Sequence, residues 1–438
     1  MDLLKDNVGK LYRKFFIASF GSALIACIYG LVDMAMVGQY HGPDGSAAMA
    51  VIAPIWNIIY SFGLLCGIGG SVIYAVARGE RDDVKEANGY FTSAFILGTL
   101  WALILWVLVW VCEEPLLRLF GANDALMPLC KEYMVAPKLT VPVYVFINLL
   151  SSFLRNDGDP GRATKAVIFG GIFNVFGDYF FVFTLDMGIK GAGIATAMGA
   201  SMSVLVMLTH FIGKKNTLKF VKPLGILNSF KMISVNGFSS FIVDVAMGIA
   251  TMLFNRRVME YLGTDALAVY GVIVVVGTLV QCCSYGIGQA AQPVISRNFG
   301  AGLTDRIKTM LKYNIITAAV FGAIWTVLSM AMPQVFIKLF MTPTPEVLSI
   351  APGIIRIYAI SFILLPFNIY STYYFQAIMR AKISLIASVA RGIVISGALI
   401  LLLPVAFGGN AVWWAMPITE AVVFVYSAVM MKKVKLSR

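Results

Sequence analysis

The chain has 438 residues, of which 59% are hydrophobic and 13% are charged, with a formal net charge of +12 and a mean hydropathy of +0.83. Soluble domains carry roughly 25% charged residues, so this composition excludes a soluble protein and indicates a chain that lies mostly in lipid. Because lipid offers the backbone no hydrogen-bond partners, long apolar runs in such a chain predict helices.

Apolar runs of about 20 residues recur along the whole chain, and each is long enough to cross a hydrocarbon core of about 30 Å. The first run is long and has no small-residue cleavage site, so we read it as a membrane span and not as a cleaved leader. We predict an all-α membrane protein with twelve spans, in chain order 15–38, 48–77, 90–112, 134–154, 163–184, 191–212, 233–254, 266–295, 313–333, 351–377, 384–405 and 411–431.

Lys and Arg gather in alternate connections between these spans. The segments on the side of the two termini carry 25 of them, and the connections on the other side carry 6. Basic residues concentrate on the cytoplasmic side of membrane proteins, so both termini are predicted to be cytoplasmic. The net positive charge is therefore a sign of topology and not of a nucleic-acid surface.

The cysteines and histidines do not suggest a cofactor. None of the six cysteines has CxxC or Cys/His spacing, and His41 and His210 are the only histidines. Cysteines within apolar spans usually serve as small hydrophobic residues, and no nucleotide-binding motif occurs. We expect no cofactor, no zinc or haem site and no ATP-driven transport within this chain.

The two halves of the chain resemble each other on either side of the basic connector 213–232. Gly67-Ile68-Gly69 pairs with Gly286-Ile287-Gly288, and Arg78 pairs with Arg297, each at an offset of 219 residues. This repeat predicts an N-terminal six-helix lobe, 1–212, and a C-terminal six-helix lobe, 233–438. Transporters built from such repeats bind their substrate between the two lobes near the membrane midplane.

Four polar residues in the N-terminal half are predicted to share one depth in the membrane: Asp33, Asn174, Asp178 and Thr196. Asn174 and Asp178 are one helical turn apart on the same face, and apolar residues take all four places in the second half. Two carboxylates in a medium of low dielectric constant cannot both ionise cheaply, so we expect them to share a proton or to bind Na⁺ with the amide and hydroxyl oxygens. The alternative is a hydrogen-bonded staple between the first, fifth and sixth spans.

Four further residues are candidates for a substrate cavity: Tyr370, Tyr374, Gln289 and Glu420. Aromatic rings suit flat organic cations, and an acidic residue inside the membrane is usually functional. The alternatives are packing for the tyrosines, helix-to-helix hydrogen bonds for Gln289, and an ion pair with Arg391 for Glu420.

Several motifs in order resemble the MATE (multidrug and toxic compound extrusion) transporters over essentially the whole chain. They are YGLVDMAMVG with Asp33, NDGDPGRAT, the Asn174-xxx-Asp178 pair, GIKGAGIAT ending at Thr196, and GIGQAAQPVISRNFGAG. The branch that they resemble is the bacterial one that includes DinF-like and MepA-like proteins.

The resemblance implies an antiporter in the bacterial cytoplasmic membrane that exports organic, mostly cationic compounds in exchange for H⁺ or Na⁺. It places the ion site on the residues that match Asp33, Asn174, Asp178 and Thr196. Some relatives use a second acidic residue in the C-terminal half, where Asp244 stands here with Ser239 and Ser240 as nearby hydrogen-bond donors. We expect a monomer that handles small organic molecules and binds no nucleic acid.

Two other functions compete with this interpretation. A flippase for lipid-linked precursors, from the same broad superfamily, would need a strongly basic cavity, whereas only Lys138, Arg356 and Arg391 fall within the predicted spans. The cavity is therefore expected to be acidic or neutral. An intramembrane enzyme would need a nucleophile with its base or a set of metal ligands, and the sequence offers neither, so we do not expect an enzyme.

Overall fold

The computed structural model describes residues 2–80, 84–223, 225–341 and 343–436, and this part of the chain is helical without any strand. The apolar runs form helices because only a helix satisfies every backbone group within one membrane-crossing segment. The predicted cytoplasmic turn after the second span includes 81–83, which lie outside the described residues.

The N-terminal half consists of seven α-helices, the first of which is very long. This helix, α1, contains a non-helical Gly42 with φ of 63° and so comprises two spans, Val8–Gly42 and Asp44–Glu80. The helices of this half are α1 (Val8–Glu80), α2 (Val84–Val111), α3 (Glu113–Leu119), α4 (Met127–Tyr133), α5 (Val135–Asn156), α6 (Pro160–Asp178) and α7 (Gly188–Leu208). A π-helical turn, Tyr179–Thr184, extends α6, and a 3₁₀ turn, Thr209–Ile212, extends α7.

The C-terminal half repeats this plan and begins with another very long helix. The helices are α8 (Ile226–Gly300), α9 (Thr304–Ala331), α10 (Pro333–Phe340), α11 (Pro345–Ala359), α12 (Leu365–Ala377), α13 (Ala381–Val389), α14 (Ile395–Phe407) and α15 (Ala415–Lys433). Short 3₁₀ or π-helical turns join them at Ile360–Ile363, Ala390–Val394 and Gly409–Trp414.

The number of membrane crossings agrees with the prediction. Eleven helices in the described residues are long and apolar enough to span a membrane, and one of them is α8 with 75 residues. At 1.5 Å per residue a straight helix of that length would measure about 110 Å, far more than a bilayer. A non-helical Gly263 with φ of 80° divides α8, so that the chain crosses the membrane twelve times.

The connector between the halves is shorter than predicted and is attached to the N-terminal half. Helix α8 already begins at Ile226, so the last part of 213–232 is helical. The carboxylate of Asp157 accepts a hydrogen bond from the backbone N–H of Thr217 at 2.9 Å, and it lies 2.8 Å from Nε2 of His210. These bonds hold the connector against the ends of α5 and α7.

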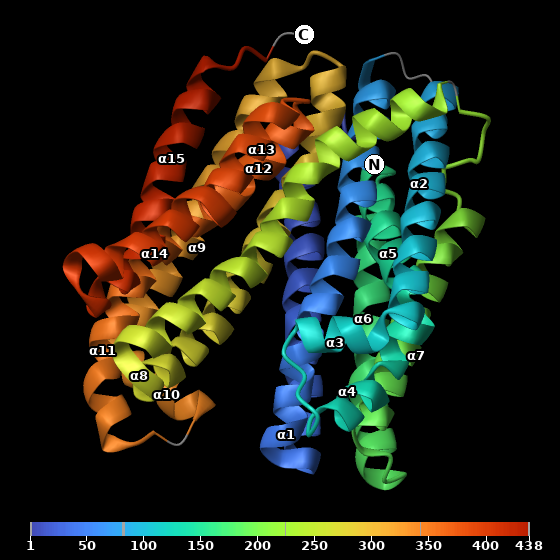
Figure 1. Cartoon of the computed structure of the whole chain (residues 1–438). Coiled ribbons are helices and arrows are strands. Elements are labelled where there is room, and N and C mark those ends of the chain that lie inside the picture. Colours follow the sequence, from blue (N-terminus) through green and yellow to red (C-terminus); the bar gives the residue numbers. More distant parts are fainter. Residues whose placement is uncertain (1, 81–83, 224, 342, 437–438) are drawn as a thin grey trace.

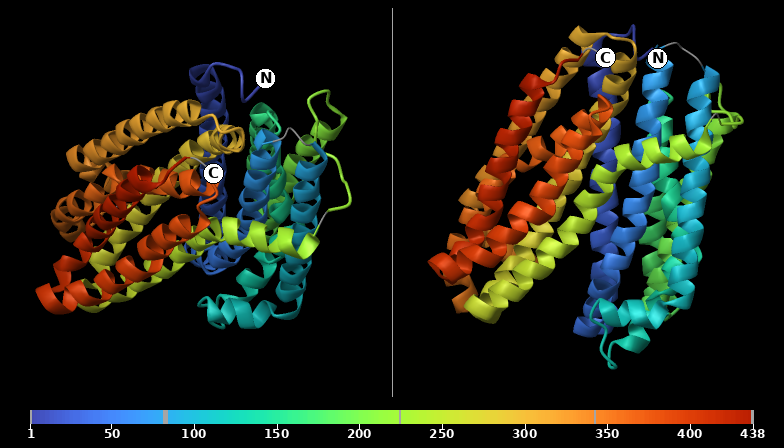
Figure 2. Two further views of the ribbon diagram at one scale, coloured as in Figure 1. Left: turned by 90° about the horizontal axis from the view of Figure 1, so that it is seen from above. Right: turned by 45° about the horizontal axis from the view of Figure 1, so that its top comes forward.

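The helices form two sets, α1–α7 of the N-terminal half and α8–α15 of the C-terminal half. The two sets meet most closely toward the end that carries both termini, and they diverge toward the opposite end (Figure 1). Figure 2 shows from above that the first span of α1 lies between the two sets. Glycines permit the close approach of α1 to α8. A Cβ atom at Gly69 would lie 2.2 Å from the carbonyl oxygen of Ile233, and one at Gly237 would lie 2.0 Å from that of Leu65. Only glycine allows backbones to come so near.

Candidate functional site

The predicted ion-binding residues are all buried in the N-terminal half. Asp33 lies on α1, Asn174 and Asp178 on α6, and Thr196 on α7. Close packing of α6 on α7 brings two of them together, because a Cβ atom at Gly199 would lie only 2.6 Å from the carbonyl oxygen of Gly170. At this contact the amide of Asn174 donates to the hydroxyl oxygen of Thr196 at 3.4 Å.

A tyrosine that sequence reasoning missed belongs to this group. The hydroxyl of Tyr133 donates to Oδ2 of Asp33 at 2.9 Å. Tyr133 ends the short helix α4, which precedes the predicted fourth span, and nothing in the local sequence pattern relates it to Asp33, 100 residues earlier. The bond depends on how α4 folds back against the spans.

Several oxygen atoms of this group have no donor among the described residues. They are Oδ1 of Asp33, Oδ1 of Asn174 and both carboxylate oxygens of Asp178, and all four are buried. Asp33 and Asp178 also lie near enough for their charges to interact. Buried polar groups in proteins nearly always have partners, so a set of unpaired oxygens with two interacting carboxylates suits a proton or a small cation.

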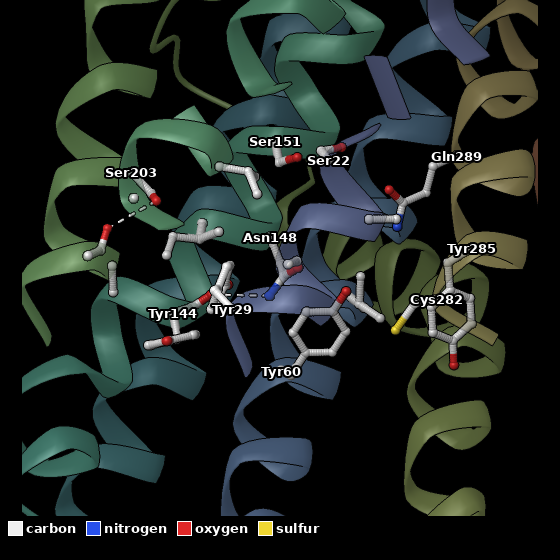
Figure 3. A pocket seen from close by; sticks show the side chains of 18 of the residues that line it. Ser22, Tyr29, Tyr60, Tyr144, Asn148, Ser151, Ser203, Cys282, Tyr285 and Gln289 are labelled. Carbon is white, nitrogen blue, oxygen red and sulfur yellow. Dashed lines mark hydrogen bonds between the residues drawn. The ribbon is translucent and has the colours of Figure 1, made fainter. Parts of the chain in front are cut away.

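A cavity between the two sets of helices reaches this group. Its empty volume, which includes its open mouth, is about 970 Å³. Asn174 and Thr196 line it on one side, while Cys282, Tyr285 and Gln289 of α8 line it on the other. In Figure 3 the labelled side chains of α8 face those of α5 and α7 across the space, with Tyr60 of α1 between them.

The predicted cavity residues have different surroundings in the structure. Gln289 lines the cavity, but Tyr370 and Tyr374 do not. These two tyrosines are 0% and 2% exposed and belong to the hydrophobic core of the C-terminal half. Their assignment to the cavity is corrected, since α12 turns this face toward its helix neighbours.

Glu420 is not a cavity residue either. One of its carboxylate oxygens accepts from Nε of Arg391 at 2.8 Å, and the other accepts from the amide of Asn368 at 2.6 Å. Glu420 is fully buried. The ion pair with Arg391, which the sequence left open as an alternative, is the arrangement observed.

Asp244 has a partner that the sequence did not suggest. The hydroxyl of Tyr285 donates to Oδ1 of Asp244 at 2.6 Å, and the amide of Gln281 donates to that hydroxyl at 2.6 Å. Ser240 bonds instead to Gln376. Tyr285 lines the cavity, so Asp244 touches the cavity wall through it.

One basic residue lies where none was expected. Arg155 directly follows the predicted fourth span, 134–154, on its cytoplasmic side, but α5 continues through Asn156, which leaves Arg155 in the last helical turn. It is 8% exposed and lines the cavity. The expectation of an acidic or neutral cavity is therefore wrong at this position.

Comparisons with known proteins agree with this architecture. A multidrug export protein, MepA, of Staphylococcus haemolyticus is 24% identical over 423 residues, which cover 95% of this chain and 92% of that protein. A structure described as the outward-facing conformation of a multidrug resistance MATE family transporter superposes with a TM-score of 0.89 at 22% identity, over 98% of this chain and 97% of that one.

A second structure is that of a MOP superfamily transporter from Pyrococcus furiosus. It is described as having a binding pocket of reverse polarity that suggests a different function. It superposes with a TM-score of 0.86 at 22% identity, over 99% of this chain and 98% of that one. These likenesses show the fold. The family model MatE matches residues 18–180 and 228–401, which together make up most of this chain. The chain therefore belongs to the MatE family, as the sequence motifs predicted.

Proposed function

We propose that this protein is a secondary-active antiporter that exports organic compounds from the bacterial cytoplasm in exchange for H⁺ or Na⁺. The observation that supports this most directly is the cavity between the two sets of helices, whose wall includes Asn174 and Thr196 of the buried polar group around Asp33 and Asp178. Relatives described as multidrug export proteins support the same direction of transport.

In this proposal residues 1–212 and 233–438 act as two lobes, and both termini face the cytoplasm. The protein works as a monomer and needs no cofactor besides its coupling ion. Protonation or Na⁺ binding at Asp33 and Asp178 removes the repulsion between the two carboxylates. A ligand shifts a conformational equilibrium only by its different affinities for the two states, so the ion must bind one lobe arrangement more tightly than the other.

The test is transport into liposomes that contain the purified protein. A fluorescent organic dye is followed while a pH gradient or a Na⁺ gradient is imposed in turn, for the parent protein and for Asp178→Asn. Glu346→Gln is the matched control, since Glu346 is an exposed carboxylate in the first turn of α11. We expect one gradient to drive transport in the parent and the control, and a loss of at least tenfold in Asp178→Asn.

Two results would contradict the proposal. If Asp178→Asn transports the dye as well as the control under both gradients, the polar group is a structural staple. If no gradient drives any dye in the parent protein, coupled export of organic compounds is wrong.

A flippase for lipid-linked precursors is the second candidate, and the buried Arg155 is the observation that favours it. A pyrophosphate carries more than one negative charge and would need several cations. Among the described residues that line the cavity, Arg155 is the single charged one. Antiport of smaller organic compounds therefore remains the better proposal.

A further inference from the structure

Arg155 is a buried guanidinium that faces the cavity without a partner. It is 8% exposed, and among the described residues no hydrogen bond or ion pair engages its side chain. The neighbouring acidic residues of the same turn are committed elsewhere, because Asp157 binds the connector and Asp159 binds Arg162. A buried charge without a partner is expensive, so its retention requires an explanation.

The position of Arg155 at the end of α5 does not explain it. Carbonyl groups at a helix C-terminus favour a cation, but that effect is small beside the cost of burying an unpaired ion. The hydroxyl groups of Tyr60 and Tyr373 lie near enough to interact with its charge, yet both are neutral. Asp244 also interacts with Tyr60, but its hydrogen bond comes from the hydroxyl of Tyr285 and not from Arg155. The charge of Arg155 therefore remains available to the cavity.

Further polar side chains lie beside Arg155 on the same face of α5. Tyr144, Asn148, Ser151 and Arg155 all line the cavity, and their spacing of three or four residues places them in one row. The amide of Asn148 donates to the backbone of its own helix at 3.3 Å, while the hydroxyl of Ser151 makes no hydrogen bond to another described residue. In Figure 3 Asn148 and Ser151 lie on the cavity wall opposite Gln289.

We propose that Arg155, with Ser151 beside it, binds an anionic group carried by the transported molecule, so that substrates are amphipathic compounds with an aromatic or apolar body and one carboxylate or similar acidic group. The body would contact the tyrosines Tyr29, Tyr60 and Tyr285, which line the same cavity. This inference rests on the proposed export function and names its substrate class. A guanidinium suits this task because its planar set of donors matches a carboxylate.

The experiment measures binding in detergent, without any gradient. The probes are a rhodamine carboxylic acid and its methyl ester, which share one ring system and differ in the acidic group. Fluorescence anisotropy gives the affinity of each probe for the parent protein, Arg155→Gln and Arg155→Lys. We expect the parent to prefer the acid, and Arg155→Gln to reduce the ratio of acid to ester affinity about tenfold or more, the usual range for a charge-assisted bond. Arg155→Lys keeps the charge but loses the planar pair of donors, so the ratio of acid to ester affinity should fall below that of the parent without disappearing.

Several results would overturn the inference. They are equal affinities for acid and ester in the parent, binding of neither probe, and a ratio that Arg155→Gln leaves unchanged. Displacement of the acid by chloride would assign the site to an inorganic anion, and displacement by a phospholipid would assign it to a lipid headgroup. If Arg155→Gln does not fold, the parent and Arg155→Lys still decide the matter. If the acid binds through Arg155 but no gradient moves it into liposomes, the site stands and the export function fails.

Discussion

Acidic residues buried in the two halves of this protein have opposite surroundings. In the C-terminal half the carboxylate of Glu420 is fully engaged by Arg391 and Asn368. In the N-terminal half both oxygens of Asp178 and one oxygen of Asp33 lack a donor among the described residues. Glu420 and Asp178 are both 0% exposed, so they differ in their hydrogen-bond partners and not in their burial. A complete set of partners indicates a carboxylate that stabilises the fold, whereas missing partners are what the proposed ion-binding role of Asp178 requires.

Between these extremes lies Asp244. One of its oxygens accepts from Tyr285, while the other has no donor among the described residues. Tyr285 lines the cavity, so Asp244 is linked to the cavity wall through the hydroxyl of Tyr285. Arg155 of α5 lies on the cavity wall opposite Tyr285 of α8. It is a cation without a partner among the described residues, as Asp178 is an acid without one. Among the described residues that line the cavity, Arg155 is the single charged one, while Asn174 and Thr196 are the members of the polar group around Asp33 and Asp178 that reach its wall.

The largest effect on stability should follow from removing one partner of the satisfied pair. Glu420→Gln leaves Arg391 buried without its counter-ion, and breaking a buried ion pair costs about 3–5 kcal/mol. Thermal unfolding of the purified protein in detergent measures the loss. The double variant Glu420→Gln/Arg391→Gln should recover most of it, since no charge is then left alone. A single variant as stable as the parent would contradict the comparison.

A smaller effect is expected at the contact between the two sets of helices. Gly69→Ala places a Cβ atom 2.2 Å from the carbonyl oxygen of Ile233, and overpacking of this kind usually costs about 1–3 kcal/mol. Gly271→Ala is the matched control, because no atom lies within 4 Å of a Cβ at that position. The control should be neutral or slightly stabilising in its helix. Equal stability of the two variants would show that the helices separate without cost.

The smallest effect on stability should come from the unpaired acid. Asp178→Asn removes a carboxylate that has no donor in the described residues, so its free energy of unfolding should change by less than about 1 kcal/mol or increase. Transport should nevertheless be lost. The same unfolding assay, run beside Glu420→Gln, makes the comparison direct. A loss as large as that of Glu420→Gln would show that Asp178 serves the fold.

Much of the fold was predictable from the sequence, while the site was predictable only in part. Apolar runs gave the crossings, and the loop charges predict the orientation. The proximity of Asn174 to Asp178 follows from the helical repeat, and the motifs predicted the family. The partner of Asp33 was not predictable, because Tyr133 lies 100 residues away on a short helix outside the predicted spans.

The amino-acid sequence by itself determined which segments enter the membrane, since hydrophobicity and backbone satisfaction depend on composition alone. The tertiary structure decided which face of each helix meets the cavity. In spans that are apolar on every side, periodicity does not reveal the inner face, and helix packing turned Arg155 toward the cavity while it turned Tyr370 and Tyr374 into the core. Helix packing likewise gave both carboxylate oxygens of Glu420 a donor and left those of Asp178 without one among the described residues, because hydrogen-bond partners come from helices that are distant in sequence.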